Sequence, residues 1–443
     1  MKIRSLPSLI SACCGFAAWL VTSQLHAQLS MPALTVPDGI GVCIHFANPK
    51  PSELQAMSDA GIRWLRADLT WSTTETTAGL YNFSQYDALV TAADLYGMKV
   101  VFILAYTNPL YDGGYSPSTT AGRQAFANWA TAAVARYQGR GYIWEVYNEP
   151  NLPFWTSSST MTVAQKADAY AQLALKVCPT IRSAFPNERL VGPSPGYFDG
   201  WNANFPATTS FLQTCLQQGL AGNFDGVTVH PYRTVEPENV WPDYNMLQGL
   251  IHNSGTSYNT TGKYPPILSG EWGYSATWFS GDQVKKAKFI SRSILHNYLC
   301  GIPLSIIYDW SNDGTDPNNM EHNFGLVGNY NHGAANPVIS PLAAYQAVKT
   351  INQKLSGYTY AGRISTGDGT DFVLKFTKDG KARYVAWTEF GQAHAATIPC
   401  AQSVQVAITS YDGGWTGTFT SGTSGGFYCG LTDAPQFIIA SGQ

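Results

Sequence analysis

The chain has 443 residues, of which 13% are aromatic and 12% are charged, and its formal net charge is −3. A chain with so few charges lacks the basic surface that nucleic acids or anionic membranes attract, so neither is expected as a partner. Its length exceeds one typical domain and suits a large barrel with an appended module. Aromatic side chains outside the core favour neutral ligands, above all sugars, because the C–H faces of sugars stack on rings.

Residues 1–27 have the pattern of an export signal. Lys2 and Arg4 supply the positive start, residues 9–21 supply the apolar stretch, and Ala27 is a small residue at the expected cleavage point. An N-terminal membrane anchor is the alternative, and no later run is long and apolar enough to span a bilayer. The mature protein is therefore expected to be secreted or periplasmic, and to be a monomer.

Six cysteines remain after this segment: Cys43, Cys178, Cys215, Cys300, Cys400 and Cys429. An oxidising compartment favours disulfides. The pairs considered are Cys400 with Cys429, near the C-terminus, and Cys178 with Cys215, on neighbouring helices. The chain has no Cys-x-x-Cys motif and no clustered histidines, so no zinc site and no cofactor are expected.

Residues 28–356 alternate short apolar runs with helical patterns. The apolar runs predict strands at 41–44, 64–67, 100–104, 144–147, 190–192, 226–230, 267–271 and 304–310. The helical patterns predict helices at 52–61, 85–96, 120–138, 163–184, 211–218, 245–253, 282–299 and 342–354, the first capped by Ser52. Eight strand-then-helix units indicate a (β/α)8 barrel rather than an open doubly wound sheet. No glycine-rich dinucleotide fingerprint follows the first strand.

Residues 357–443 have a different pattern. Alternating apolar runs at 372–376, 384–387, 404–408 and 436–439 are separated by glycine-rich turns such as Gly413-Gly414 and Gly425-Gly426. This pattern predicts an antiparallel, sandwich-like β domain packed on the barrel. Its expected role is structural, with a sugar-binding module as the alternative. Residues 29–38 are expected either to add a strand to this domain or to cover the floor of the barrel.

The segment Asn148-Glu149-Pro150 follows the fourth predicted strand. Pro150 cannot donate a hydrogen bond to a sheet, and it biases Glu149 toward extended geometry. An amide and a carboxyl group are thus expected at the exit of a strand. Taken alone, the segment is equally compatible with a structural role and with a catalytic one.

Barrel active sites lie at the carboxyl ends of the strands. Polar and aromatic residues occupy several of these ends: Arg66, Asn148, Glu149, His230, Tyr232, Glu271, Trp272 and Trp310. Glu149 and Glu271, from strands four and seven, are expected to face each other across the barrel mouth. Glycoside hydrolysis needs such a pair, one acid protonated and the other ionised. A cation such as Arg66 lowers the pKa of a carboxyl beside it, which suits a nucleophile.

These motifs resemble clan A of the glycoside hydrolases, the retaining barrels with acids on strands four and seven, and specifically families 39 and 5. The motifs are Asn148-Glu149-Pro150, His230-Pro231-Tyr232, Ser269-Gly270-Glu271-Trp272-Gly273 and Trp310. The resemblance implies that Glu149 is the acid/base and that Glu271 is the nucleophile of a double displacement. The two carboxyl groups of a retaining enzyme lie about 5–5.5 Å apart, whereas those of an inverting enzyme lie about 6.5–9.5 Å apart.

The resemblance also implies roles for residues near Glu149 and Glu271. Asn148 is expected to bind the sugar 2-hydroxyl, while Arg66 and Tyr232 hold Glu271 ionised and oriented. His230 is expected to line the same subsite.

Four further residues are candidate sugar contacts. Trp310 is the expected sugar platform, and Trp272, His45 and Tyr106 are the other three. Tyr106 and Asn108 lie where family 5 often has a histidine-bearing segment, which slightly favours family 39. Four acids are interpreted as structural: Asp68, Glu75, Glu145 and Asp309.

The substrate is predicted only as a class. Few basic residues occur in the aromatic-rich loops, which disfavours a polymer of uronic acids. Endo-acting cleavage of a β-linked neutral glycan is expected. An exo-acting β-glycosidase, such as a β-xylosidase, and a transglycosylase are the alternatives. A non-catalytic carbohydrate-binding barrel is least favoured, because both acids are present.

Overall fold

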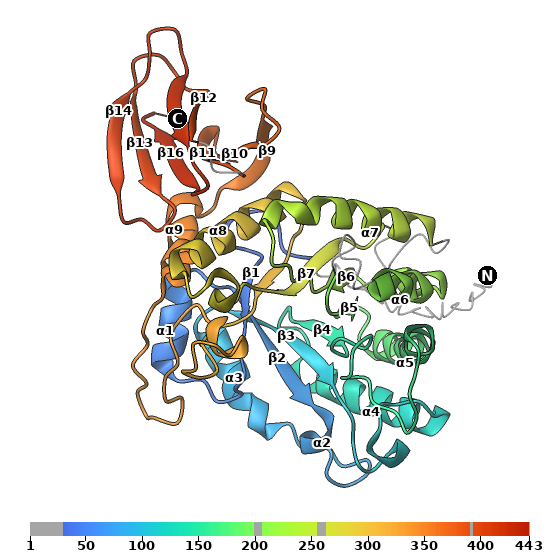
Figure 1. Cartoon of the computed structure of the whole chain (residues 1–443). Coiled ribbons are helices and arrows are strands. Elements are labelled where there is room, and N and C mark those ends of the chain that lie inside the picture. Colours follow the sequence, from blue (N-terminus) through green and yellow to red (C-terminus); the bar gives the residue numbers. More distant parts are fainter. Residues whose placement is uncertain (1–29, 199–205, 255–262, 390–392, 443) are drawn as a thin grey trace, which may run out of the picture.

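The computed structural model describes residues 30–198, 206–254, 263–389 and 393–442. They form a closed parallel barrel surrounded by helices, followed by an antiparallel β domain (Figure 1). The predicted fold class is therefore confirmed. The predicted export signal lies outside the described residues. Among those that are described, no helix combines the length and apolar character needed to cross a membrane.

The barrel has eight parallel strands in sequence order, and β1 closes it by pairing with β8. The strands are β1 (Ile40–Cys43), β2 (Trp64–Thr70), β3 (Lys99–Ala105), β4 (Ile143–Val146), β5 (Arg189–Pro193), β6 (Gly226–Val229), β7 (Ile267–Trp272) and β8 (Ser305–Ile307). Most of their residues are buried, because one face packs in the barrel and the other against helices. This explains why the strands read as nearly continuous apolar runs.

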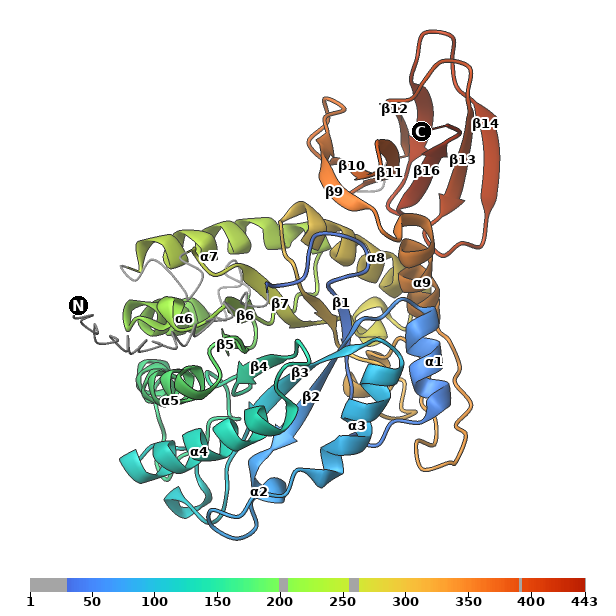
Figure 2. The ribbon, with the colours of Figure 1, turned by 180° about the vertical axis from the view of Figure 1, so that it is seen from behind.

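The helices cover the outside of the barrel (Figure 2). They are α1 (Pro51–Asp59), α2 (Trp71–Thr74), α3 (Ser84–Leu95), α4 (Thr120–Tyr137), α5 (Val163–Ala184), α6 (Pro206–Gln217), α7 (Trp241–Asn253), α8 (Gln283–Leu299) and α9 (Ala343–Leu355). The predicted cap of the first helix was wrong. Lys50 is the N-cap and Pro51 occupies the first helical turn, where its fixed φ suits the helix and its missing N–H costs nothing.

The C-terminal domain has two antiparallel sheets. The larger has the order β14-β13-β16-β11-β10-β9, and the smaller pairs β12 with β15. The strands are β9 (Thr359–Ile364), β10 (Asp371–Lys378), β11 (Lys381–Thr388), β12 (His394–Ile398), β13 (Gln405–Ser410), β14 (Thr416–Thr420), β15 (Phe427–Leu431) and β16 (Gln436–Ala440). Apolar side chains from both sheets form one core, which includes Val373, Ile398, Leu431 and Ile438.

The β domain packs on α8 and α9 of the barrel (Figure 1). The Trp387 indole N–H donates to Oε1 of Glu238 at 2.8 Å, and the Arg292 guanidinium holds the same carboxylate. The described part of the segment before β1 adds no strand to the β domain, although Thr35 forms an isolated antiparallel bridge with Thr359. Val36 N–H donates to the Tyr358 carbonyl at 3.0 Å beside β9, and Met31 packs on the core at the barrel floor.

The six cysteines in the described part of the chain are free thiols. The predicted disulfides between Cys400 and Cys429, and between Cys178 and Cys215, are therefore absent from it. Cys429 is buried in the core of the β domain, and Cys215 is buried on α6, where its thiol contacts the Ala167 carbonyl. These side chains behave as small apolar core residues.

Candidate active site

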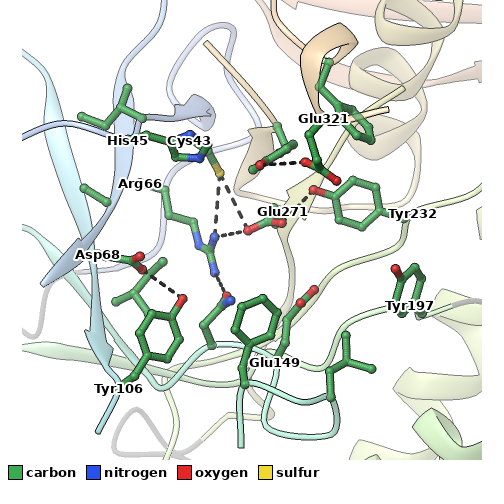
Figure 3. A pocket seen from close by; sticks show the side chains of 18 of the residues that line it. Cys43, His45, Arg66, Asp68, Tyr106, Glu149, Tyr197, Tyr232, Glu271 and Glu321 are labelled. Carbon is green, nitrogen blue, oxygen red and sulfur yellow. Dashed lines mark hydrogen bonds and ion pairs between the residues drawn. The ribbon is translucent and has the colours of Figure 1, made fainter. Parts of the chain in front are cut away.

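A cavity of about 740 Å³ opens at the carboxyl ends of the barrel strands (Figure 3). Its polar lining includes Arg66 from β2, Asn148 and Glu149 from the loop after β4, and Glu271 from β7. Aromatic side chains form much of the remaining wall: Tyr106, Phe154, Tyr197, Tyr232, Trp278, Tyr308 and Phe324. The position agrees with the rule that barrel enzymes build their sites at this face.

Glu271 is held at both carboxylate oxygens. The Arg66 guanidinium donates to Oε2, and the Tyr232 hydroxyl donates to Oε1 at 2.7 Å. Burial by itself raises the pKa of Glu271, but the charges of Arg66 and His230 and the Tyr232 hydrogen bond outweigh it, and the pKa is lowered. The side chain is therefore ionised and oriented, as a nucleophile requires.

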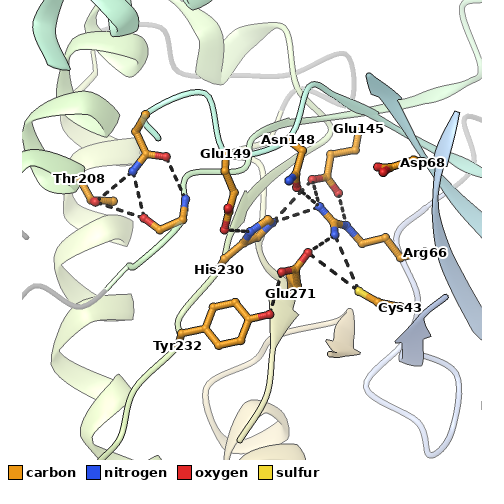
Figure 4. A network of polar contacts seen from close by, with 12 residues as sticks. Cys43, Arg66, Asp68, Glu145, Asn148, Glu149, Thr208, His230, Tyr232 and Glu271 are labelled. Carbon is orange, nitrogen blue, oxygen red and sulfur yellow. Dashed lines mark hydrogen bonds and ion pairs between the residues drawn. The ribbon is translucent and has the colours of Figure 1, made fainter. Parts of the chain in front are cut away.

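Arg66 is the centre of a buried polar network (Figure 4). Its Nε and Nη2 donate to Glu145 at 3.0 and 2.7 Å, and Nη2 also donates to Oδ1 of Asn148 at 2.7 Å. Glu145 is fully buried, which raises its pKa, but Arg66 and His230 overcome this and bring the pKa down to about 2. Glu145 thus positions the guanidinium that in turn holds Glu271.

Glu149 lies in the loop after β4 with φ of +44°, so the expectation of extended geometry before Pro150 was wrong. The Glu149 N–H donates to the Ser194 carbonyl at 3.0 Å, which fixes the loop against the end of β5. Gly196 makes room for the side chain, since a Cβ on it would lie 2.5 Å from Oε1 of Glu149. The contacts of this loop with the end of β5 therefore outweigh the preference for extended backbone that Pro150 imposes on Glu149.

His230 is fully buried and is not among the described residues that line the cavity. The expectation that it lines a sugar subsite is therefore not met. Its Nδ1 lies 2.9 Å from Oε1 of Glu149, and its Nε2 lies 3.7 Å from Oε1 of Glu145. Burial lowers the pKa of His230, but Glu271 and the contacts to Glu145 and Glu149 raise it to about 9. The Nδ1 contact positions the carboxyl group of Glu149, while Nε2 also lies 3.3 Å from Nη2 of Arg66.

The two acids lie close together. One carboxylate oxygen of Glu149, one of Glu271 and a ring nitrogen of His230 are all within 4.8 Å of one another. Carboxylate oxygens this close are compatible with a retaining pair, whose carboxyl groups lie about 5–5.5 Å apart. The arrangement can support attack by Glu271 on a sugar carbon while Glu149 protonates the leaving oxygen.

Three other candidate contacts reach the cavity wall. Asn148 lines it while its Oδ1 accepts from Arg66, which leaves the amide N–H groups for a ligand. Tyr106 lines it and donates to Asp68 at 3.3 Å. His45 lines it as well, half-exposed, at the exit of β1.

The two predicted tryptophan contacts do not reach the cavity. Trp310 is 1% exposed, and its indole N–H donates to the Tyr330 hydroxyl at 2.9 Å. Trp272 is 3% exposed, and its indole N–H donates to Ser305 at 2.9 Å. A sugar platform needs an exposed ring face, so the platform role of Trp310 and the contact assigned to Trp272 are corrected to core packing.

The structure adds residues that the sequence analysis did not assign to the site. Cys43, at the end of β1, has its thiol 4.0 Å from Oε2 of Glu271 and 3.8 Å from Arg66. Burial, followed by the charge of Glu271, raises the pKa of this thiol, which keeps it neutral. Glu321 lines the cavity and accepts from the Tyr308 hydroxyl at 3.2 Å. Cys43 could have been predicted as a site residue, because it lies at the end of a strand. Glu321 lies in a long loop, and no sequence pattern indicated that it lines the cavity.

Solved structures resemble the chain over most of its length. A family 39 glycoside hydrolase from Bacteroides cellulosilyticus WH2 is 24% identical with a TM-score of 0.74, covering 93% of this chain and 81% of that one. A family 30 endoxylanase from Clostridium papyrosolvens C71 is 16% identical with a TM-score of 0.61, covering 94% and 98%. A monomeric β-xylosidase from Caulobacter crescentus CB15 is 15% identical with a TM-score of 0.60, covering 93% and 97%. At these identities the likeness establishes the fold.

No curated protein matches the chain at a significant level. The family model of cellulase, glycosyl hydrolase family 5, matches residues 37–312, which is the greater part of the chain and contains both acids. The predicted resemblance to clan A is confirmed, although Tyr106 and Asn108 had slightly favoured family 39. With its paired acids on a closed eight-stranded barrel, the chain belongs to the cellulase family, family 5 of the retaining glycoside hydrolases.

Proposed function

We propose that the protein is an endo-acting glycosidase that cleaves a β-linked neutral polysaccharide by double displacement, with Glu271 as nucleophile and Glu149 as acid/base. The observation that carries this proposal is that one carboxylate oxygen of Glu149 lies within 4.8 Å of one carboxylate oxygen of Glu271 at the cavity. Glu271 is held as an anion by Arg66 and Tyr232, so it is suited to attack the anomeric carbon.

In the first step Glu271 forms a bond to the anomeric carbon while the bond to the leaving oxygen breaks. Glu149 gives its proton to that oxygen. In the second step Glu149 takes a proton from water, which attacks the same carbon and releases Glu271 as a carboxylate. His230 keeps Glu149 in place in both steps, because its buried Nδ1 contacts Oε1 of Glu149.

The size and the lining of the cavity support an endo-acting enzyme. A volume of about 740 Å³ lies in the upper half of the range of roughly 300–1,000 Å³ for ligand pockets, so it holds more than one sugar ring. Phe154 and Tyr197 are exposed rings at its edge, and Phe154 stacks on Tyr106. Such rings suit successive sugars of a neutral chain.

Xylans are the first substrates to test. The similar solved structures include an endoxylanase and a β-xylosidase. Reducing ends released from xylans, β-glucans, mannans, galactans and bacterial exopolysaccharides measure the specificity. An endo-acting enzyme yields a ladder of oligosaccharides and a rapid loss of viscosity, whereas release of single sugars alone contradicts this part of the proposal.

The catalytic assignment has its own test. On the best substrate of the screen, Glu149→Gln and Glu271→Gln should each lose activity while the fold stays intact. A Glu271→Gln variant with a near-normal rate would contradict the assignment. Products longer than the substrate would identify glycosyl transfer in place of hydrolysis. Secretion is part of the proposal and is tested by N-terminal sequencing of protein exported by its native host.

A further inference from the structure

Three potential metal ligands meet at the wall of the cavity: His45, Asp309 and Asp313. His45 follows β1 and the two aspartates follow β8, and these strands are neighbours where the barrel closes. One ring nitrogen and two carboxylate oxygens lie within 4.8 Å of one another. Nδ1 of His45 is 3.1 Å from Oδ1 of Asp313 and 4.0 Å from Oδ2 of Asp309.

Asp309 supplies an independent observation that points to a ligand. Its side chain is almost fully buried, and its Oδ1 has no hydrogen-bond partner among the residues that the structure describes. Lys286 is a buried lysine in its surroundings, but its side-chain nitrogen donates to the carbonyls of Asn323 and Gly325, at 2.8 and 2.7 Å. Burying a carboxylate without partners is costly, so a bound cation would satisfy this group.

A simple ion pair does not account for the whole cluster. Nδ1 of His45 lies 3.1 Å from Oδ1 of Asp313, so these two side chains can pair without an ion. That pair leaves Asp309 at 4.0 Å from the ring and Oδ1 still without a partner. A cation among the three groups would bind the carboxylate of Asp309 together with the two side chains that already pair.

We propose that His45, Asp309 and Asp313 bind one divalent cation at the wall of the catalytic cavity. The mixture of imidazole and carboxylate donors suits zinc or manganese. The ion would tie the loop after β1 to the loop after β8. Because His45 itself lines the cavity, coordination positions remain open on that side for water or a sugar hydroxyl. Sequence spacing does not reveal the site, since His45 and Asp313 are 268 positions apart.

The full-length protein, dialysed against a chelator and then against metal-free buffer, tests this proposal. Calorimetric titration with zinc chloride, and separately with manganese chloride, should show one site that depends on the three residues. His45→Gln and Asp313→Asn should each weaken the affinity for the ion by at least about tenfold, the lower end of the loss seen even for outer-sphere substitutions. Both side chains are partly exposed, so both variants are expected to fold. His252→Gln, which changes an exposed histidine on α7, is the matched control and should keep the wild-type affinity.

The outcomes separate this site from a similar group of side chains in the β domain. A second group of one histidine and two aspartates, Asp368, Asp371 and His394, lies in the β domain. If Asp371→Asn abolishes binding while His45→Gln does not, the ion belongs to the β domain and the proposal is wrong. Absence of binding, or equal affinity in the wild type and the His45 and Asp313 variants, overturns it as well. The experiment measures affinity for the metal ion and not catalytic activity. Its result therefore does not depend on whether the proposed function is correct.

Discussion

Replacing Tyr232 by phenylalanine tests how the fold keeps Glu271 ready for attack. The substitution removes one hydroxyl, which donates to Oε1 of Glu271 at 2.7 Å, and leaves the ring in the cavity wall. A hydrogen bond to an ionised group contributes about 1.5–3 kcal/mol. At about 1.4 kcal/mol per factor of ten, its loss corresponds to a decrease of about 10–150-fold in kcat/KM where ionisation of Glu271 limits the rate.

The sign of the pH effect follows from the charges. The Tyr232 hydrogen bond is one of the interactions that lower the pKa of Glu271, so its removal raises that pKa. The acid limb of the kcat/KM profile, which reports ionisation of the nucleophile in the free enzyme, should therefore move to higher pH. The loss of activity should be greatest at the acid end of the profile.

The assay is kcat/KM measured across pH for wild type, Tyr232→Phe and a control. Tyr345→Phe is the matched control, because its buried hydroxyl donates to the backbone carbonyl of Ala56 on α1, away from the acids. This control should keep the wild-type profile. If Tyr232→Phe also keeps it, the hydroxyl does not stabilise the ionised nucleophile and the reasoning fails.

Three further substitutions test the residues that support the two acids. Glu145→Gln removes one of the two carboxylates that hold the buried Arg66 guanidinium, and Glu271 remains as the other. Urea denaturation should therefore show a loss of about 1.5–3 kcal/mol in the free energy of unfolding. Gly196→Ala would place a Cβ 2.5 Å from Oε1 of Glu149, and the displaced acid should lower kcat by about 100-fold in steady-state assays. Trp387→Phe leaves the buried Glu238 with one donor fewer, so urea denaturation should show about 1–3 kcal/mol less stability, with kcat/KM unchanged.

The barrel could be predicted because each strand-then-helix unit has its own local pattern. Helix α5 was predicted with the bounds that the structure has, since its apolar residues recur at helical spacing and Thr162 caps it. Strand β14 was missed because it is the edge strand of its sheet, and most of its residues are exposed, so it carries no apolar run. Strand β12 is short, and only two of its five residues are buried.

Site residues could be predicted where they lie at the end of a strand. They could not be predicted where contacts with distant segments determine whether a side chain is buried or how its backbone is oriented. Glu149 and Glu271 could be found because the fold brings the ends of β4 and β7 to one mouth. The prediction for Trp310 was wrong because the long loop after β8 buries its ring. Tyr330, twenty positions further along the chain, lies in this loop and accepts the hydrogen bond from the Trp310 indole N–H. The φ of Glu149 is likewise set by a partner distant in sequence, Ser194.

The most direct test of the central claim is to trap the covalent intermediate. A 2-deoxy-2-fluoro glycoside with a good leaving group, made from the sugar that the substrate screen identifies, slows the second step more than the first. Intact-mass measurement followed by peptide mapping should then show one glycosyl group, attached to the peptide that contains Glu271. Attachment to another residue, or complete turnover with inverted anomeric configuration and no adduct, would contradict a double displacement with Glu271 as nucleophile.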